Sequence, residues 1–306
     1  MIAAIKAWSP RTLAEAYQIL TQEQGRIKVL AGGTDVMVAL QARTECAPAY
    51  LNLWPLAELR GIAETQDAVR LGALTTYTQL MRSTLVQQQA PILVDAAGVI
   101  GARQIQNRGT LGGNIVNASP AGDTLPVLAV LEATLELGSA RGTRLVPFNA
   151  FYTGYRQTVL AADELLLAVI LPKRRPQERQ YFRKVGTRQA QAISKVVMAL
   201  LLQQTQPGRV DFIRIAFGSV APTVMRAPRT EAVLQDQILS RDRIAAARAQ
   251  VMAEVRPISD VRSTADYRRT VAGNILARAL YDCEQGDQPA APAAAFAGPG
   301  QSGVWR

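Results

Sequence analysis

Hydrophobic and polar positions recur with two different periods along this 306-residue chain, and these periods predict its helices and strands. Apolar residues at helical spacing predict a helix over Pro10–Gln24, with Ser9 as its N-cap and Gly25 at its end. Helical spacing recurs at 76–81, 84–99 and 125–131. The expected N-caps are Thr75 for the first of these helices and Ser83 for the second. Short apolar runs predict strands at 27–31, 50–53, 69–73, 133–137, 143–146 and 164–171.

A charged stretch at residues 173–178, which contains Pro176 and directly follows Pro172, separates this part of the chain from a second patterned part. There the pattern predicts strands at 180–185, 196–204 and 210–220 and then helices at 229–237, 241–255 and 265–284. We therefore expect an α+β protein with one domain at 1–176 and a smaller one at 177–286. The Ala-, Pro- and Gly-rich residues 287–306 are predicted to be a disordered tail.

The composition is that of a globular protein, with 48% hydrophobic and 19% charged residues. Aromatic residues make up only 6%, so the core is expected to be aliphatic. No apolar run approaches the ~18 residues that span a bilayer, so no membrane span is expected. The N-terminus lacks the basic head and long apolar run of a secretory signal, and we expect a cytoplasmic protein.

The chain has no histidine and only two cysteines, Cys46 and Cys283, and this composition limits its chemistry. Histidine bases and histidine-ligated metals are excluded, and two separated cysteines cannot build a zinc site or an iron–sulfur cluster. No metal site is therefore expected, and the cysteines are interpreted as buried or incidental thiols. Any redox chemistry has to come from an organic cofactor or a partner chain.

The net charge of +10 raises nucleic acid as one ligand class. However, the Lys and Arg residues are dispersed, and no aromatic-interleaved basic platform accompanies them. An acidic partner or a phosphate-bearing ligand explains the charge better, so no nucleic-acid partner is expected.

Two glycine-rich segments are the strongest candidates for a binding site. Arg103–Asp123 contains Thr110-Leu-Gly-Gly-Asn114, and Gly32-Gly33-Thr34-Asp35 follows a predicted strand. Neither matches the triphosphate or dinucleotide fingerprints, so each alone is more typical of a tight turn. Together, paired glycines beside hydroxyl side chains are typical of amide nests that hold a diphosphate. Hydroxyls of Thr34, Thr110 and Ser119 are further candidate donors, and the carboxylate of Asp123 suits a ribose hydroxyl.

Two other residues are ambiguous from the pattern alone. Lys184 is a candidate point charge for a ligand, but a solvated strand lysine is the more ordinary interpretation. The aromatic segment Phe151–Arg156 is expected to be a structural corner in which Arg156 pairs with a carboxylate.

With these segments placed, the sequence resembles the FAD-binding medium subunits of the molybdenum hydroxylases, the group of xanthine dehydrogenase and carbon monoxide dehydrogenase. The resemblance covers roughly residues 1–284. Its landmarks follow in order at 29–36, 105–123, 151–156, 184–188, 192–195, 217–222 and 267–274. As an ordered set these motifs are highly specific.

The resemblance implies a FAD-binding domain of the p-cresol methylhydroxylase type followed by the smaller α+β domain. It places Asp123 at the adenosine half of FAD, Ile100 near the flavin ring, and Leu166 and Lys184 at further flavin-proximal positions. It assigns no catalytic residue to this chain. The implied cofactor contacts are Val29, Leu30, Ala31, Gly32, Gly33, Thr34, Asp35, Val36, Ile100, Thr110, Leu111, Gly112, Gly113, Asn114, Asp123, Leu166 and Lys184.

The implied function is that of an electron-transfer subunit. Molybdopterin would be carried by a large partner subunit and 2Fe–2S clusters by a small one, and such heterotrimers can pair into a dimer. Electrons would pass from the clusters to FAD and then to NAD or another acceptor. Relatives that use NAD have charged residues in a loop that matches Gln189–Ala192, which is uncharged here, so the acceptor stays open. The alternatives are a stand-alone FAD-dependent oxidoreductase of the same fold family and a basic nucleic-acid-binding module.

Overall fold

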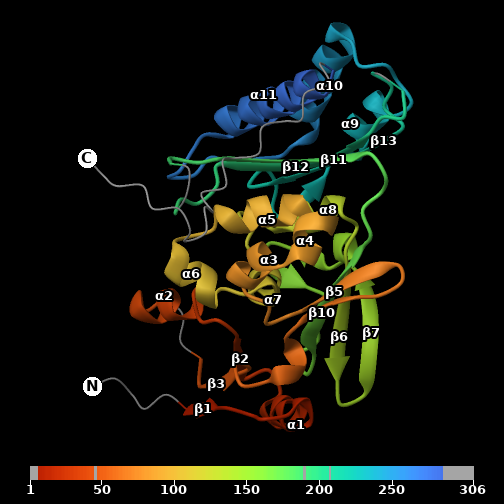
Figure 1. Cartoon of the computed structure of the whole chain (residues 1–306). Coiled ribbons are helices and arrows are strands. Elements are labelled where there is room, and N and C mark those ends of the chain that lie inside the picture. Colours follow the sequence, from red (N-terminus) through yellow and green to blue (C-terminus); the bar gives the residue numbers. More distant parts are fainter. Residues whose placement is uncertain (1–5, 45–46, 189–190, 207, 285–306) are drawn as a thin grey trace, which may run out of the picture.

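The computed structural model describes residues 6–44, 47–188, 191–206 and 208–284, and within these ranges the strands form four sheets (Figure 1). The first sheet is small and parallel, with the order β1-β3-β2. It consists of β1 (Lys6–Trp8), β2 (Ile27–Leu30) and β3 (Ala49–Asn52), with α1 (Leu13–Glu23) and α2 (Val36–Gln41) in the connections. Helix α1 starts later than the sequence predicts. Its N-cap is Thr12 rather than Ser9, because the Thr12 hydroxyl accepts from the Glu15 amide.

The second sheet is antiparallel with the order β4-β5-β10-β6-β7. Its strands are β4 (Ile62–Glu64), β5 (Ala68–Gly72), β6 (Thr134–Ser139), β7 (Gly142–Pro147) and β10 (Leu165–Pro172). The connections contain two one-turn 3-10 helices, η1 (Ala57–Leu59) and η2 (Phe148–Ala150). They also contain the third sheet, a hairpin of β8 (Tyr152–Gly154) with β9 (Gln157–Thr158).

Six short helices connect β5 to β6. They are α3 (Tyr77–Arg82), α4 (Thr84–Gln89), α5 (Pro91–Gly98), α6 (Arg103–Arg108), α7 (Leu111–Asn117) and α8 (Leu125–Val130). The single helix predicted at 84–99 is wrong, since Ala90 leaves the helical region before Pro91, which lacks the amide needed to continue α4.

The caps and the glycine-rich stretch also differ in part from expectation. Thr76, not Thr75, caps α3 through a reciprocal capping box with Gln79, whereas Ser83 caps α4 as predicted. The stretch Arg103–Asp123 contains two helical segments, α6 and α7, rather than only turns.

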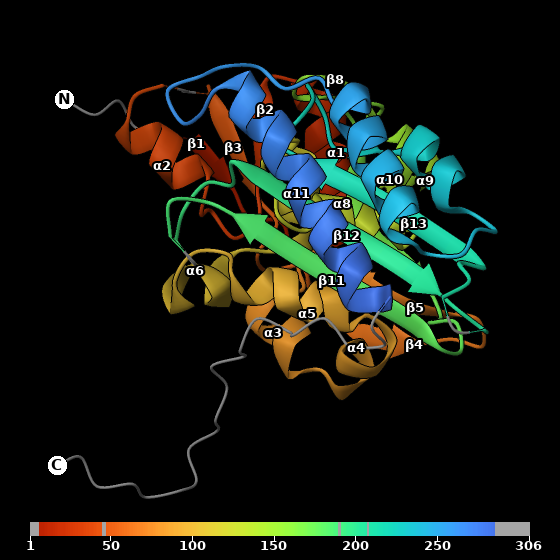
Figure 2. The ribbon, with the colours of Figure 1, turned by 90° about the horizontal axis from the view of Figure 1, so that it is seen from above.

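The fourth sheet belongs to the last third of the chain and has the order β11-β12-β13-β14. Its strands are β11 (Glu178–Val185), β12 (Val196–Gln203), β13 (Phe212–Gly218) and β14 (Met225–Arg226). Three helices follow: α9 (Pro228–Leu234), α10 (Arg241–Glu254) and α11 (Ala265–Glu284). Seen from above, α10 and α11 cover one face of this sheet (Figure 2).

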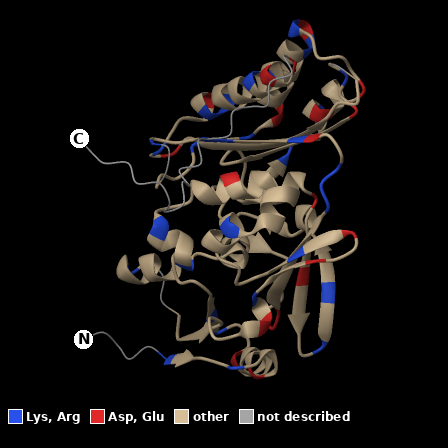
Figure 3. Cartoon of the chain, viewed as in Figure 1, with Lys and Arg blue, Asp and Glu red and all other residues tan. Residues whose placement is uncertain are grey.

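The α+β class is confirmed, and the layers explain how the protein is held together. Helices α5 and α8 lie between the second and fourth sheets, and aliphatic side chains from all of them form one continuous core. A second core fills the space between the fourth sheet and its covering helices, and a third surrounds the first sheet. In the view of Figure 3, Lys and Arg residues lie among Asp and Glu residues on many elements.

Two predictions concern residues outside the described ranges: the tail at 287–306 and the environment of Cys46. Cys283 is buried on α11, and burial raises the pKa of its thiol to about 11, as expected for an inert thiol. None of the helices within the described ranges has the length and apolarity to cross a bilayer.

Candidate functional site

Two cavities that meet at a shared neck form the candidate site. The first, about 340 Å³, is called the leucine cavity and is lined by Leu53, Leu59, Leu74, Leu165 and Leu166 together with Val29. The second, about 880 Å³, is called the wide cavity and is lined by residues of both halves of the chain. The residues that line both cavities define the neck, and they are Thr34, Asp35, Tyr77, Asn114, Asn117 and Arg156.

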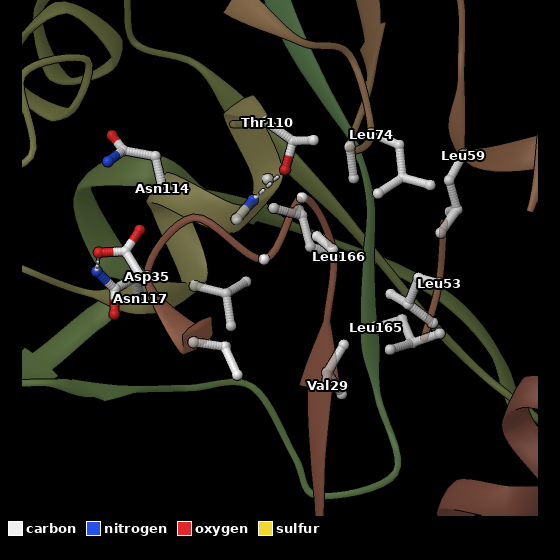
Figure 4. Close-up of a pocket in the computed structure, with 18 of the residues that line it drawn as sticks. Val29, Asp35, Leu53, Leu59, Leu74, Thr110, Asn114, Asn117, Leu165 and Leu166 are labelled. Atoms are coloured by element: carbon white, nitrogen blue, oxygen red, sulfur yellow. Dashed lines mark hydrogen bonds between the residues drawn. The ribbon is translucent and has the colours of Figure 1, made fainter. Parts of the chain in front are cut away.

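The leucine cavity lies where the first two sheets meet. Figure 4 shows its leucine side chains gathered on one side, whereas Thr110, Asn114, Asp35 and Asn117 lie on the other. Leu165 and Leu166 are adjacent residues of β10, one packed in the core of the first sheet and the other in the main core. The cavity thus offers an apolar pocket that ends in polar groups, the usual form of a site for a ring attached to a charged group.

The segment after β2 supplies unpaired amides at the polar end. Gly33 has a φ of +82°, and its carbonyl accepts the Met37 amide at the start of α2. The amides of Gly32, Gly33, Thr34 and Asp35 donate to no acceptor among the described residues. All four residues line the leucine cavity, so these donors form the nest that the sequence predicts for an anion.

The backbone of this nest packs closely against the end of α6, and this contact fixes its position. A Cβ atom on Gly32 would lie 1.8 Å from the carbonyl oxygen of Arg108 at the end of α6. Only glycine fits at this position, and it holds the nest against the start of the Thr110–Asn114 segment.

The second Gly-Gly pair has a different role from the one predicted. The four amides at the start of α7 are all satisfied: Leu111 and Gly112 donate to the carbonyls of Thr75 and Ala73, and Gly113 and Asn114 donate to Thr110. The expectation that both pairs offer free amides is therefore wrong for this one. Its glycines allow α7 to pack closely, since a Cβ on Gly112 would lie 2.7 Å from the Ala73 oxygen.

Asp35 is the acidic group at the neck. Its carboxylate does not cap α2 but accepts a hydrogen bond of 3.1 Å from the side-chain amide of Asn117. Burial raises the pKa of Asp35, against the opposing effects of Arg156 and Asn117.

A buried ion pair lies on the wall of the wide cavity. Lys184 Nζ on β11 lies 2.6 Å from Asp123 Oδ2 and also donates to the Val99 carbonyl at 3.3 Å. The Ser194 hydroxyl donates to the other oxygen of Asp123 at 2.5 Å. Only 5% of the Lys184 side chain is exposed, so the solvated interpretation of this lysine is wrong. Burial raises the pKa of Asp123, and Lys184 and Ser194 oppose that shift.

The structure groups the predicted contacts differently from the resemblance. Asp123 and Lys184 were expected toward opposite ends of FAD, but they form one ion pair beside Ile100 in the wide cavity. Leu166, expected near the flavin ring together with Lys184, lines the leucine cavity with Val29 instead.

The remaining predicted contacts divide simply. Ala31, Val36, Thr110, Gly112 and Gly113 line the leucine cavity, and Thr34, Asp35 and Asn114 line the neck. Leu30 and Leu111 line neither cavity, and Leu111 is buried in the main core.

The predicted contacts do not include several lining residues, above all Tyr77, Asn117, Ser194 and four leucines of the leucine cavity, Leu53, Leu59, Leu74 and Leu165. Tyr77 occupies the first position of α3, where nothing in the local pattern marks it as different from a core residue. Among the described residues no group of three or more His, Cys, Asp or Glu is placed to hold a metal ion.

Fold and site together define a protein with two lobes around a two-chambered ligand site. Residues 3–174 match the model of the FAD binding domain in molybdopterin dehydrogenase, and residues 180–283 match that of the CO dehydrogenase flavoprotein C-terminal domain. The chain belongs to this family of FAD-binding subunits of molybdenum hydroxylases, and it is an oxidoreductase subunit.

Individual relatives agree over nearly the whole chain. The chain is 34% identical to the xanthine dehydrogenase FAD-binding subunit of Escherichia coli O157:H7, over 88% of this chain and 94% of that protein. It is 30% identical to the carbon monoxide dehydrogenase medium chain of Hydrogenophaga pseudoflava, over 89% and 94%. A solved structure of carbon monoxide dehydrogenase from Hydrogenophaga pseudoflava, which lacks the Mo-pyranopterin moiety of the molybdenum cofactor, superposes with a TM-score of 0.88, covering 92% of this chain and 98% of that one.

The family match confirms FAD as the cofactor, and the residues of the site fit it. Free amides beside a neck suit a diphosphate, and two chambers of unequal size suit the two rings of a dinucleotide.

Proposed function

We propose that FAD extends through both chambers, with its adenine in the leucine cavity and its flavin ring in the wide cavity. The observation that carries this orientation is the difference between the cavities on the two sides of the neck. The leucine cavity is the smaller and has several leucines in its lining, whereas the wide cavity is larger and contains the buried ion pair. A flavin that exchanges electrons with other groups needs the roomier chamber.

This orientation assigns a place to each contact. Leu166 and Val29 would pack on the adenine, and the amides of the segment 32–35 would bind the diphosphate. Ile100, Asp123 and Lys184 would lie beside the flavin ring. Bound FAD supplies reversible electron uptake and release, and the protein holds the ring and controls what surrounds it.

The wider role that we propose is electron transfer within a heteromeric molybdenum hydroxylase. A large subunit would carry molybdopterin, a small subunit would carry 2Fe–2S clusters, and electrons from those clusters would reach the FAD of this chain and then NAD or another acceptor. The named relatives, a FAD-binding subunit and a medium chain, support this assignment. The absence of histidine from the sequence also fits a chain that leaves substrate chemistry to a partner.

The architecture proposed for the chain follows the same division. The FAD domain would comprise residues 1–176 and the second domain 177–286, in line with the two matched segments. We place the complex in the cytoplasm as a heterotrimer, with pairing of two heterotrimers as a higher assembly.

Co-expression with the neighbouring genes tests this role. A tagged chain should co-purify with a large and a small subunit and contain about one FAD per chain. Anaerobic addition of the substrate should bleach the flavin absorbance only when both partners are present. If the isolated chain binds FAD and oxidises a substrate alone, it is a stand-alone oxidoreductase, and if the folded chain takes up no FAD, the proposal fails altogether.

A further inference from the structure

Two side chains at the neck have hydrogen-bonding groups that form no hydrogen bond with another described residue. They are Tyr77, at the start of α3, and Arg156, which lies between β8 and β9. Both line the leucine cavity and the wide cavity, so both border the passage that joins them.

The Tyr77 ring is held firmly in place. Its amide donates to the Gly109 carbonyl at 3.2 Å, and a Cβ on Gly109 would lie 2.7 Å from the ring. Only 4% of the residue is exposed, yet its hydroxyl makes no hydrogen bond to any other described residue. The hydroxyl oxygen is not among the fully enclosed unpaired atoms of the described residues, and Tyr77 lines both cavities, so this donor is open to an acceptor on a ligand in the neck.

The charge environment of this hydroxyl keeps it protonated. Burial raises the pKa of Tyr77, and the nearby carboxylates of Asp35 and Asp123 raise it further. Tyr77 is therefore a hydrogen-bond donor throughout the physiological pH range.

Arg156 is the cation of the neck. Of the six neck residues it alone carries a positive charge, and its guanidinium forms no ion pair or hydrogen bond with another described residue. Its backbone φ of +54° lies in the left-handed region, which an arginine seldom adopts. The expectation that Arg156 pairs with a carboxylate is not met at hydrogen-bonding distance, although its charge lowers the pKa of Asp35.

A diphosphate at the neck needs more than amides. The amides of segment 32–35 supply dipoles but no net charge, and Asp35 adds a negative charge beside them. A cation and a fixed hydroxyl donor next to that nest would offset both the carboxylate and the charges of the phosphates.

We propose that Tyr77 and Arg156 form a diphosphate clamp, in which the hydroxyl and the guanidinium bind phosphate oxygens of FAD that the nest leaves free. This inference rests on the proposed course of FAD through the neck. It adds two cofactor contacts that the glycine-rich motifs do not mark.

The test compares binding of FAD and of riboflavin, which has no diphosphate, to the FAD-stripped full-length chain by fluorescence titration. Tyr77→Phe removes only the hydroxyl and should weaken FAD binding about tenfold, because a hydrogen bond to a charged group is lost. Arg156→Gln should weaken FAD binding by about tenfold or more and reduce the salt dependence of that binding. Neither variant should change riboflavin binding.

Matched controls are Tyr181→Phe, a buried tyrosine of the fourth sheet, and Arg248→Gln on α10, neither of which lines the leucine cavity or the wide cavity. Circular dichroism checks that each variant is folded. Arg156 is exposed, so its substitution should leave the core intact. The clamp is refuted if both variants bind FAD as tightly as the wild type, or if FAD and riboflavin binding weaken equally. In either case the proposed function still stands as long as the wild type binds FAD. A wild-type chain that binds no FAD refutes the proposed function itself.

Discussion

Lys184 Nζ lies 2.6 Å from Asp123 Oδ2, so an ion pair connects the fourth sheet to the segment between α7 and α8. Both side chains are almost fully buried, and the Ser194 hydroxyl and the Val99 carbonyl complete the cluster. The two halves of the chain are thus joined by charge at the wall of the wide cavity, as well as by the apolar core.

Replacing Lys184 by an uncharged residue should lower the stability of the protein. Lys184→Met leaves the Asp123 carboxylate buried without its partner and should lower the free energy of unfolding by about 3–5 kcal/mol. Adding Asp123→Asn should recover part of the loss, because no unpaired charge then remains. Urea unfolding of the two single variants and the double variant measures the coupling. Additive losses would show that the pair contributes nothing as a pair.

Asp123 and Lys184 also show what sequence can and cannot predict here. Asp123 is a candidate ribose contact from its segment and Lys184 becomes a site candidate through the family resemblance, whereas loop 32–35 is predicted to be an amide nest only when both Gly-Gly segments are considered together. Their ion pair could not be predicted, because the two residues are 61 positions apart, with most of the second sheet between them, and no local pattern encodes which lysine meets which aspartate.

The helices of the glycine-rich stretch escaped prediction for a similar reason. Gly112 and Gly113 weaken any local preference for a helix, but the backbone carbonyls of Ala73 and Thr75 receive the first amides of α7. The helix is thus stabilised by contacts with a distant segment rather than by its own residues. The longer strands, in contrast, were well placed because a continuous apolar run, as in β10, or partial alternation, as in β13, reports burial directly.

Gly112 should tolerate no side chain. In Gly112→Ala the new Cβ would lie 2.7 Å from the Ala73 oxygen and 2.8 Å from the Ala73 Cβ, so α7 must shift. We expect a loss of about 2–3 kcal/mol of stability and weaker FAD binding. Gly98→Ala at the end of α5 is the control, since its Cβ would have only a contact of 3.9 Å with Met81 Sδ and should leave both properties nearly unchanged. Thermal unfolding and FAD titration measure the two effects, and equal behaviour of the two variants contradicts the packing argument.

Asp95 on α5 should make stability depend on pH. Burial raises the pKa of its carboxyl from 3.8 to about 6. Because the folded-state pKa is the higher one, the associated stability is fully present below about pH 4 and is lost as the pH rises through about 6. Asp95→Asn removes the ionisation and should raise stability at pH 7.5 by roughly 1 kcal/mol, allowing for the water-exposed part of the group. Urea midpoints between pH 4 and pH 8 check this. A wild type and variant with parallel pH profiles would refute it.

Thr110 should couple the stability of α7 to FAD binding. Its hydroxyl accepts the Gly113 amide at 3.0 Å, and its carbonyl accepts the amide of Asn114, which lies at the neck. Thr110→Val keeps the volume but removes the cap, so it should cost about 1 kcal/mol of stability and leave a buried amide unpaired.

The matched control is Thr12→Val, which removes the cap of α1 far from either cavity. Both variants should lose similar stability in urea unfolding, but only Thr110→Val should weaken FAD binding, by roughly threefold to tenfold, because α7 presents Asn114 to the neck. Equal FAD affinity in the two variants would mean that α7 keeps its position without its cap. In that case the close packing of Gly112 on Ala73, rather than the hydrogen bonds of the first turn, sets the position of the neck.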